Sequence, residues 1–417
     1  MEHTTAKSES EIPIILPDDV IVEMILPRLP VKPLTRFKCV SKFWLTTLSS
    51  NKFAKTHLKF SSLSNTKSLI YKEINCYRRR YGRFLSFDEC YNMKEFVYLE
   101  DKYNNPRYRL TPRATRIVGS SNGILCMFDS DFFEFVLWNP VTNHYQIAGG
   151  PELNYVPNDD VTGVGFGYIS SIDDYKIGCL VHSDQGVCHV HVYSLKNREW
   201  KETACLEANE YVPIDRCYYS ALVDNTIYWP PEARLYGDEE SRIVGLNLVS
   251  GLLTNVPLPI LPTRNFDAKV FEIKGSLSLC CTKYVHGRHT KRISDIWTLK
   301  KDGSGSSWEK SFSVTIKGLT LLYIFETGKC LVTRNSNQLM LLDPSEATSR
   351  SSTKDYGEVK AIWQRHKRSR GNLLNFYHKA IADVWNYTEG LISPSGIFAR
   401  VVNEDDSETG ERVEDNA

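Results

Sequence analysis

The sequence predicts a mainly β protein with a small N-terminal α-helical module of three short helices, followed by a β-propeller-like domain of about six blades. Three observations predict this fold class. Helical apolar spacing is confined to residues 12–57, short apolar runs separated by Gly, Asn, Asp and Pro fill residues 58–395, and these runs recur every 50 to 53 residues. A period near fifty with several strands in each unit is typical of a propeller blade.

The repeated unit begins with a tight polar turn that leads into a short apolar strand. Two further strands joined by a polar turn follow it, as in VLWNPVTNHYQI and HVYSLKNREW. One more step toward the N-terminus reaches SLIYKE and RFLSFDE, which would complete six blades. Ring closure would then pair a strand near 391–392 with one near 69–70, and an open β-sandwich is the alternative. The turns lie around Gly123, Asp174, Asn225, Gly275 and Gly328.

The helical module is short for the amount of apolar surface that it carries. Pro17 suits the first position of a helix, a second helix is expected to begin at Pro33, and a third near Ser41. Apolar residues occur on nearly every side of the first helix, so one core-facing stripe cannot use them all. Segments of about forty residues rarely fold stably alone. The module therefore needs a partner.

The segment LPDDVIVEMILPRLPVKPLTRFKCVSKFW resembles the F-box of plant F-box proteins in order, spacing and residue type. In that family the F-box binds a Skp-type adaptor and so joins a cullin-based ubiquitin ligase. Pro27 departs from the family pattern, and it can tilt the last helical turn and weaken adaptor binding. A generic helical hairpin that packs on the rest of the chain is the alternative. The resemblance assigns adaptor binding to Leu16, Pro17, Ile21, Ile25, Leu29, Pro30, Leu34, Phe37, Val40 and Trp44.

Segments of the repeats, among them LWNPVTNHY, VYSLKNREW and DNTIYWPP, resemble the F-box-associated domain of the same plant family. This resemblance implies a non-catalytic substrate receptor. The F-box would hold one end of the protein, the β domain would bind a protein substrate, and other subunits would attach ubiquitin to it. The competing hypothesis is a standalone propeller enzyme or carbohydrate-binding module with a helical appendage, and co-purification with an adaptor would distinguish the two.

Four long loops are the expected substrate surface, because loops on a rigid β frame commonly carry recognition. They are rich in charge, Pro and Tyr, and a tyrosine supplies rigid amphipathic contact area. Tyrosines that pack on their own blades are the alternative. The loops are 154–161, 208–217, 232–241 and 284–291, and their candidate substrate-binding residues are Tyr155, Tyr211, Tyr236 and Tyr284.

Composition argues against several classes of protein. The chain has 51 Lys and Arg against 50 Asp and Glu, so no overall field favours nucleic acid or membrane surfaces. Its 11 cysteines are irregularly spaced and lack a CxxC pair, which suits a reducing compartment. No signal peptide or membrane-spanning run is evident, so we expect the cytoplasm or the nucleus. Residues 1–11 and the acidic tail 396–417 are expected to be disordered, and the basic runs 78–80 and 365–370 to be solvated loops.

Catalytic motifs are absent from the sequence, which contains no GxSxG, HExxH or Walker A pattern. The glycines of GVGFG (163–167) are best explained by relief of crowding in a strand. His189 and His191 share one face of a strand, an arrangement that can suit a metal, but no third ligand is fixed by the sequence. We therefore expect no catalytic residue, no cofactor and no metal.

Overall fold

The structure, a computed structural model, describes most of the chain, and every structural statement below refers to the described residues. They are residues 16–61, 68–73, 83–87, 93–97, 115–130, 132–152, 160–183, 186–206, 219–231, 242–260, 266–284, 291–302, 305–334, 338–344, 359–364 and 384–397.

Six four-stranded antiparallel sheets form the β domain. Blade 1 contains β24 (Val384–Tyr387), β1 (Ser68–Glu73), β2 (Arg83–Phe87) and β3 (Met93–Val97). Blade 2 contains β4 (Thr115–Ser121), β5 (Ile124–Asp129), β6 (Glu134–Asn139) and β7 (His144–Gly149). Blade 3 contains β8 (Asp160–Ile169), β9 (Asp174–His182), β10 (Cys188–Ser194) and β11 (Glu199–Leu206).

The other three blades follow the same order along the chain. Blade 4 contains β12 (Ala221–Val223), β13 (Thr226–Trp229), β14 (Arg242–Asn247) and β15 (Leu253–Pro257). Blade 5 contains β16 (Asp267–Ile273), β17 (Ser276–Tyr284), β18 (Lys291–Asp302) and β19 (Gly305–Lys317). Blade 6 contains β20 (Thr320–Ile324), β21 (Cys330–Arg334), β22 (Gln338–Leu342) and β23 (Val359–Gln364).

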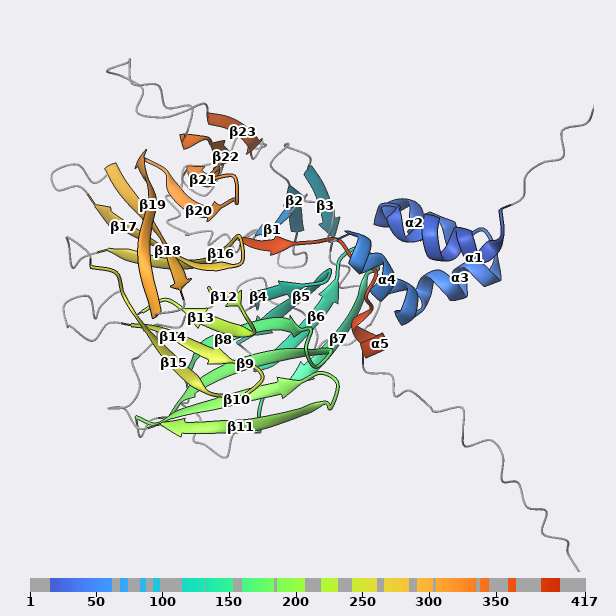
Figure 1. Cartoon of the computed structure of the whole chain (residues 1–417), viewed down its shortest axis with the longest axis horizontal. Helices are drawn as coiled ribbons and strands as arrows, with labels where there is room; N and C mark the ends of the chain where they lie inside the picture. The colour runs from blue at the N-terminus through green and yellow to red at the C-terminus, as the bar shows by residue number, and fades with distance from the viewer. Residues whose placement is uncertain are drawn as a thin grey trace, which may run out of the picture.

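The first strands of the six blades close a ring. β24 contacts β4, and contacts then run from β4 to β8, β12, β16 and β20, which contacts β24 again (Figure 1). This cycle makes the domain a six-bladed propeller, which confirms the predicted fold class and rules out an open sandwich.

The strand that closes the ring comes from near the C-terminus. β24 pairs with β1, with Trp385 opposite Ile70. The prediction that residues 391–392 make this pairing is therefore wrong by about one strand length. Leu391 and Ile392 are buried instead in a core cluster shared by blades 2 and 3 and the helical module.

The polar turns recognised in the sequence form tight hairpins between the first and second strands of blades. Asn122 and Gly123 both have positive φ angles, of 53° and 85°, and Asp224 and Asn225 have φ angles of 48° and 64°. Two successive residues with positive φ match the twist of the flanking strands, and Asn, Asp and Gly adopt this conformation most readily. The repeat detected in the sequence is thus the repeat of this hairpin.

Neighbouring blades are joined at the same point of the repeat. The indole N–H of Trp200 donates to the Gly149 carbonyl at 2.7 Å, and that of Trp308 donates to the Pro257 carbonyl at 2.7 Å. Each tryptophan lies 51 residues after its acceptor, which is about one sequence repeat, so each hydrogen bond joins two adjacent blades. Blades 3 and 4 approach closely at β8, where a Cβ on Gly165 would lie 2.6 Å from the Ile227 side chain. Relief of crowding is therefore the role of this glycine, as predicted.

The helical module differs in detail from the prediction. Its elements are α1 (Asp18–Val20), a π-helical segment (Ile21–Ile25), a 3₁₀ turn (Leu26–Arg28), α2 (Val31–Phe37), α3 (Lys42–Ser49) and α4 (Asn51–Ser61). The first helix changes its winding before the buried Pro27, which lies in the 3₁₀ turn. The second helix starts at Val31 rather than at Pro33.

The third helix begins where the sequence places it. The Ser41 hydroxyl caps α3 by accepting from the Trp44 N–H at 3.1 Å. The last helix of the module, α4, has 11 residues and is additional to the three helices that were predicted. No helix of the described ranges is long and apolar enough to cross a membrane.

Candidate functional site

The helical module exposes several large apolar side chains, and we call this set the module surface. It comprises six of the eleven large hydrophobic side chains exposed in the described part of the chain, all within residues 16–45. Exposed apolar groups that gather on one small element typically mark an interaction site. The set is Leu16, Met24, Ile25, Val40, Phe43 and Leu45, with exposed fractions between 40% and 64%.

The inner face of the same module is part of the protein core. Leu26, Leu34, Leu48 and Phe53 are buried in one cluster with side chains of blades 2 and 3. The helices therefore cannot turn their outer side chains inward without giving up this packing. A stable inner face leaves the module surface free for another molecule.

The residues assigned from the resemblance divide into three groups. Leu34 has no exposed surface, so it supports the helices from inside and offers no contact area. Phe37 and Trp44 are half-buried and pack edge to face, with ring centroids 5.6 Å apart. Sequence reasoning missed Met24, Phe43 and Leu45, because they fall between the apolar positions that the helical spacing predicts to be buried. Leu16, Pro17, Ile25, Pro30 and Val40 are exposed, and Ile21 and Leu29 are half-buried.

A short C-terminal segment, residues 388–397, holds the module against the propeller, and we call it the strap. It contains the helix α5 (Pro394–Ile397), which contacts β6 and β7. Asn51 at the start of α4 donates its side-chain N–H to the Gly396 carbonyl at 3.1 Å. The strap thus touches both the module and blade 2 (Figure 1). Residues 398–417, which include most of the predicted disordered tail, lie outside the described residues.

Asn139 fixes the strap on blade 2. Its amide N–H groups donate to the carbonyls of Gly390 and Ile392 at 2.9 and 2.7 Å, and its side-chain oxygen accepts from two N–H groups of its own turn. The side chain is fully buried, so no water can replace these bonds without rearrangement. Gly390 lies so close to the Asn122–Gly123 turn that a Cβ on it would be 2.5 Å from the Asn122 carbonyl oxygen.

Polar contacts add a second attachment between module and propeller. The ammonium group of Lys55 on α4 lies 2.5 Å from a carboxylate oxygen of Asp173 in the β8–β9 turn, and the Tyr168 hydroxyl donates to the other oxygen at 2.6 Å. These two hydrogen bonds, from Lys55 first and Tyr168 second, lower the pKa of Asp173. Burial and the Asp173 carboxylate raise the pKa of Tyr168 to about 12.

His57 lies inside the module itself. Its Nε2 is 3.0 Å from the Leu29 carbonyl, so Nε2 carries the proton and donates. Burial lowers the pKa of His57, since a charged imidazolium would lose its hydration there. The residue therefore stays neutral in the folded module.

The two ends of the propeller carry different connections. The turns that meet the module or the strap, 122–123, 140–143 and 170–173, all follow the first or third strand of a blade. We call this the proximal end. In an up-and-down blade the connections after the second and fourth strands lie at the opposite end, which we call the distal end.

All four predicted substrate loops are connections of the distal kind. They link β7 to β8, β11 to β12, β13 to β14 and β17 to β18, so the flanking strand ends share the distal end. Tyr155, Tyr211 and Tyr236 lie outside the described residues. Tyr284 is the last residue of β17, and its side chain is outside the described set. The basic runs 78–80 and 365–370 also lie outside it.

A cavity of about 290 Å³ lies at the centre of the ring. The first strand of every blade contributes to its wall, and the lining mixes aromatic, aliphatic and polar side chains. Lys269 is held at its edge by donation to the Leu321 carbonyl at 2.8 Å. The cavity can hold a small ligand or one inserted side chain. One lining residue from each blade is Trp385, Ser121, Phe166, Leu222, Lys269 and Tyr323.

Comparisons with known proteins agree with this architecture. The sequence profile of the F-box associated beta propeller domain matches residues 70–393. An F-box/kelch-repeat protein of Arabidopsis thaliana is 27% identical over 325 residues, which cover 77% of this chain and 84% of the relative. An F-box protein of the same plant is 24% identical over 374 residues, covering 79% of this chain and 85% of the relative. Among solved structures, the nidogen/laminin complex matches with a TM-score of 0.36 at 9% identity over 67% of this chain and 89% of that one, a score too low to establish a shared fold.

Proposed function

Because the chain belongs to the family of plant F-box proteins with a C-terminal F-box-associated β-propeller domain, and so has the general role of a substrate-recognition protein, we propose that it is the substrate receptor of a Skp–cullin–F-box ubiquitin ligase. In this proposal the module surface binds a Skp-type adaptor. The distal end of the propeller binds a protein substrate, which is then ubiquitinated and degraded.

The module surface is the observation that carries the proposal. Six large apolar side chains within residues 16–45 are exposed, while Leu26, Leu34 and Leu48 of the same module are buried against blades 2 and 3. An adaptor with an apolar groove would bury this surface at about 25 cal/mol for each Å² removed from water. Leu29 and Trp44, which are half-buried, would support the exposed residues from behind.

Fixed geometry supports a mechanism based on proximity. The strap and the Lys55–Asp173 contact hold the module on the proximal end, so adaptor and substrate would occupy opposite ends of one rigid body. A conjugating enzyme carried by the cullin would then meet the substrate at a high effective concentration. The receptor supplies position, and other subunits supply the chemistry.

The described cysteines also suit a receptor that is not itself an enzyme. Burial raises the pKa of Cys280 to about 11 and that of Cys330 to about 12, so both thiols stay protonated at neutral pH. A ligase that forms a thioester would need an activated thiolate. All eight cysteines of the described part are free, which fits the proposed location in the cytoplasm or the nucleus.

The test of adaptor binding uses substitutions that leave the core untouched. Val40 is 64% exposed and Phe43 is 53% exposed, so Val40→Asp and Phe43→Asp should fold normally and lose adaptor binding in a pull-down by at least about tenfold. Ile260→Asp is the matched control, since Ile260 is 97% exposed but lies on the propeller after β15. Full adaptor capture by both module variants would refute the proposal.

The substrate surface is tested by loop exchange. Each of the four distal loops is replaced by a short Gly/Ser linker, and adaptor binding and substrate capture are measured separately. Retained adaptor binding with lost capture is the expected result. Undiminished capture after all four exchanges would place the substrate site elsewhere.

A further inference from the structure

We propose that His189, Glu202 and Cys205 form a binding site for a zinc-class divalent cation on the outer strands of blade 3. His189 is on β10, and Glu202 and Cys205 are on β11. Their candidate ligand atoms all lie within 4.8 Å of one another. Imidazole nitrogen, carboxylate oxygen and thiolate sulfur are the three ligand types that zinc prefers in proteins.

A β-bulge brings the three side chains to one face. Cys205 pairs directly with His189, and Glu202 pairs with His191, because the register shifts by one residue between Val190 and His191. Thr203 is the extra residue on β11. In a regular ladder Thr203 would lie opposite His191, and Glu202 would point to the other face of the sheet. The bulge therefore creates the cluster.

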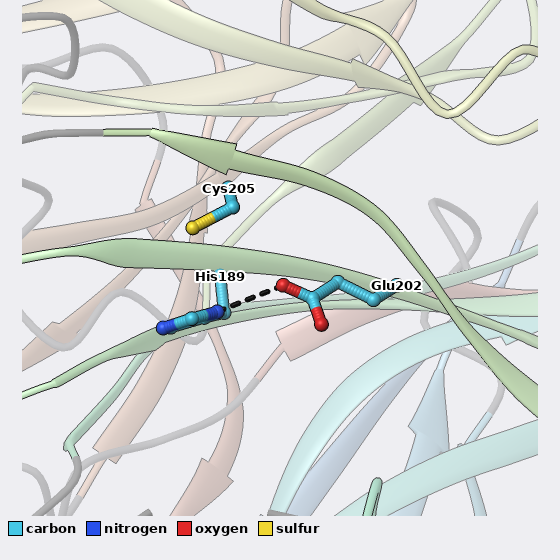
Figure 2. A group of neighbouring side chains, drawn as sticks. All are labelled: His189, Glu202 and Cys205. Carbon is cyan, nitrogen blue, oxygen red and sulfur yellow. Dashed lines mark hydrogen bonds and ion pairs between the residues drawn. The ribbon is translucent and has the colours of Figure 1, made fainter.

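The three side chains need only small movements to bind a cation together. His189 Nδ1 is 2.8 Å from a carboxylate oxygen of Glu202, and the Cys205 thiol lies above the imidazole in the view of Figure 2. A tetrahedral zinc with bonds of about 2.0–2.3 Å needs ligand atoms roughly 3.4–3.7 Å apart. The His189–Glu202 pair, now 2.8 Å apart, would therefore widen by about 0.6 Å, and a pair as far apart as 4.8 Å would close by about 1 Å. The side chain of Glu202 is 42% exposed and Cys205 is exposed, so both can move, while His189 at 11% is held in place.

His191 provides a second observation at the same place. It is 4% exposed, and its Nε2 is a buried nitrogen that has no hydrogen-bond partner among the described residues. Its ring lies 6.4 Å from that of His189. An unsatisfied buried imidazole beside three metal-type ligands is explained if an ion and its bound water complete the site, since the water can donate to Nε2.

The site lies at the distal end of blade 3. His189 is the second residue of β10 and Cys205 the penultimate residue of β11, and residues 207–218 leave from the end of that strand. A cation bound here would link β10 to β11 next to the point where the connection to blade 4 begins. The inference stands apart from the proposed function, because the cluster is far along the chain from the module surface and needs no adaptor.

The experiment uses the full chain, stripped with a chelator and titrated with Zn²⁺ and then Co²⁺. We expect one equivalent of Zn²⁺ per chain, a thiolate-to-cobalt charge-transfer band, and a rise in Tm on adding Zn²⁺. Cys205→Ser should abolish the band and the Tm rise, and both Cys205→Ser and Glu202→Gln should weaken Zn²⁺ binding at least about tenfold. Both substitutions are at exposed positions and leave the core intact.

Two controls locate any binding that is seen. Cys39→Ser removes an exposed thiol of the module, and Glu199→Gln removes an exposed carboxylate of β11, so neither should change the titration. Absence of stoichiometric binding would overturn the proposal. Unchanged affinity and an unchanged cobalt band in Cys205→Ser would overturn it equally, since the ion would then be bound elsewhere.

Discussion

Asn139→Ala should detach the strap from blade 2 without unfolding the propeller. The wild-type side chain donates two buried hydrogen bonds to the strap, of 2.9 Å to Gly390 and 2.7 Å to Ile392, and accepts two within its own turn. Loss of the amide leaves two carbonyls without this donor in a buried site. Each lost neutral bond costs about 1 kcal/mol, and a buried group left unsatisfied costs about 1–3 kcal/mol.

Asn247→Ala is a matched control that isolates the strap bonds. Asn247 occupies the same position in blade 4, and its side-chain oxygen also accepts from two N–H groups of its turn, at 3.0 and 2.9 Å. It donates only a long bond of 3.4 Å to Thr226 and does not touch the strap. Subtracting the effect of Asn247→Ala therefore removes the contribution of the turn. The difference should be about 2–4 kcal/mol, from the two donated bonds alone.

Amide hydrogen exchange measures this difference locally. The Gly396 N–H donates to the Ser393 carbonyl at 3.1 Å within the strap and reports its opening. A difference of about 2–4 kcal/mol predicts exchange faster by roughly 30-fold to several hundred-fold in Asn139→Ala. Exchange in β9 and β10 should not change. Equal exchange of Gly396 in the two variants would refute the claim that Asn139 holds the strap.

Three further predictions concern the module and its junction with the propeller. Gly390→Ala should destabilise the protein by about 1–3 kcal/mol in thermal denaturation, because the added Cβ would lie 2.5 Å from the Asn122 carbonyl oxygen. Gly149→Ala is the control and should be close to neutral, because its Cβ would meet nothing within 4 Å. The pKa of His57 is lowered from 6.5 in the folded chain, so the unfolded chain binds the proton more readily. The contribution of neutral His57 to the free energy of unfolding is therefore complete above about pH 6.5 and decreases as the pH falls below it. His57→Gln keeps a donor for the Leu29 carbonyl and should flatten that part of the Tm–pH curve; an unchanged slope would assign it to another group. Lys55→Ala should cost only about 0.2–1 kcal/mol in urea denaturation, because Lys55 and Asp173 are 52% and 50% exposed, and a larger loss would show that the contact does more than a surface ion pair.

The class of the fold and the nature of the module could be predicted from the amino-acid sequence. Both depend on local patterns. The positive φ angles of a turn such as Asn122–Gly123 follow from its own residues, and the recurrence of such turns near every fiftieth residue is visible in the sequence. The cap of α3 is equally local, because Ser41 bonds to an N–H three residues away. Such features depend on neighbours in the chain, so reading them in order is enough.

Which apolar residues of the module are exposed depends on how its helices pack in the folded protein. Leu34 and Phe43 are equally apolar in sequence, yet Leu34 is fully buried against the propeller cluster and Phe43 is 53% exposed. The outcome depends on how α2 and α3 sit on blades 2 and 3 and on the strap. Residues 391–392 could not be placed from the sequence for the same reason, because an apolar pair is compatible both with the strand that closes the ring and with a buried part of the strap.

The cluster on blade 3 depended on tertiary structure most of all. His189 was visible as a metal-type residue in its strand, but Glu202 and Cys205 were not, because a side chain's face depends on register. The β-bulge at Thr203 places Glu202 on the same face as His189, and no local pattern in the sequence predicts this bulge. Local conformation follows from the order of residues, whereas a site shared between strands follows from pairing that only the folded chain sets.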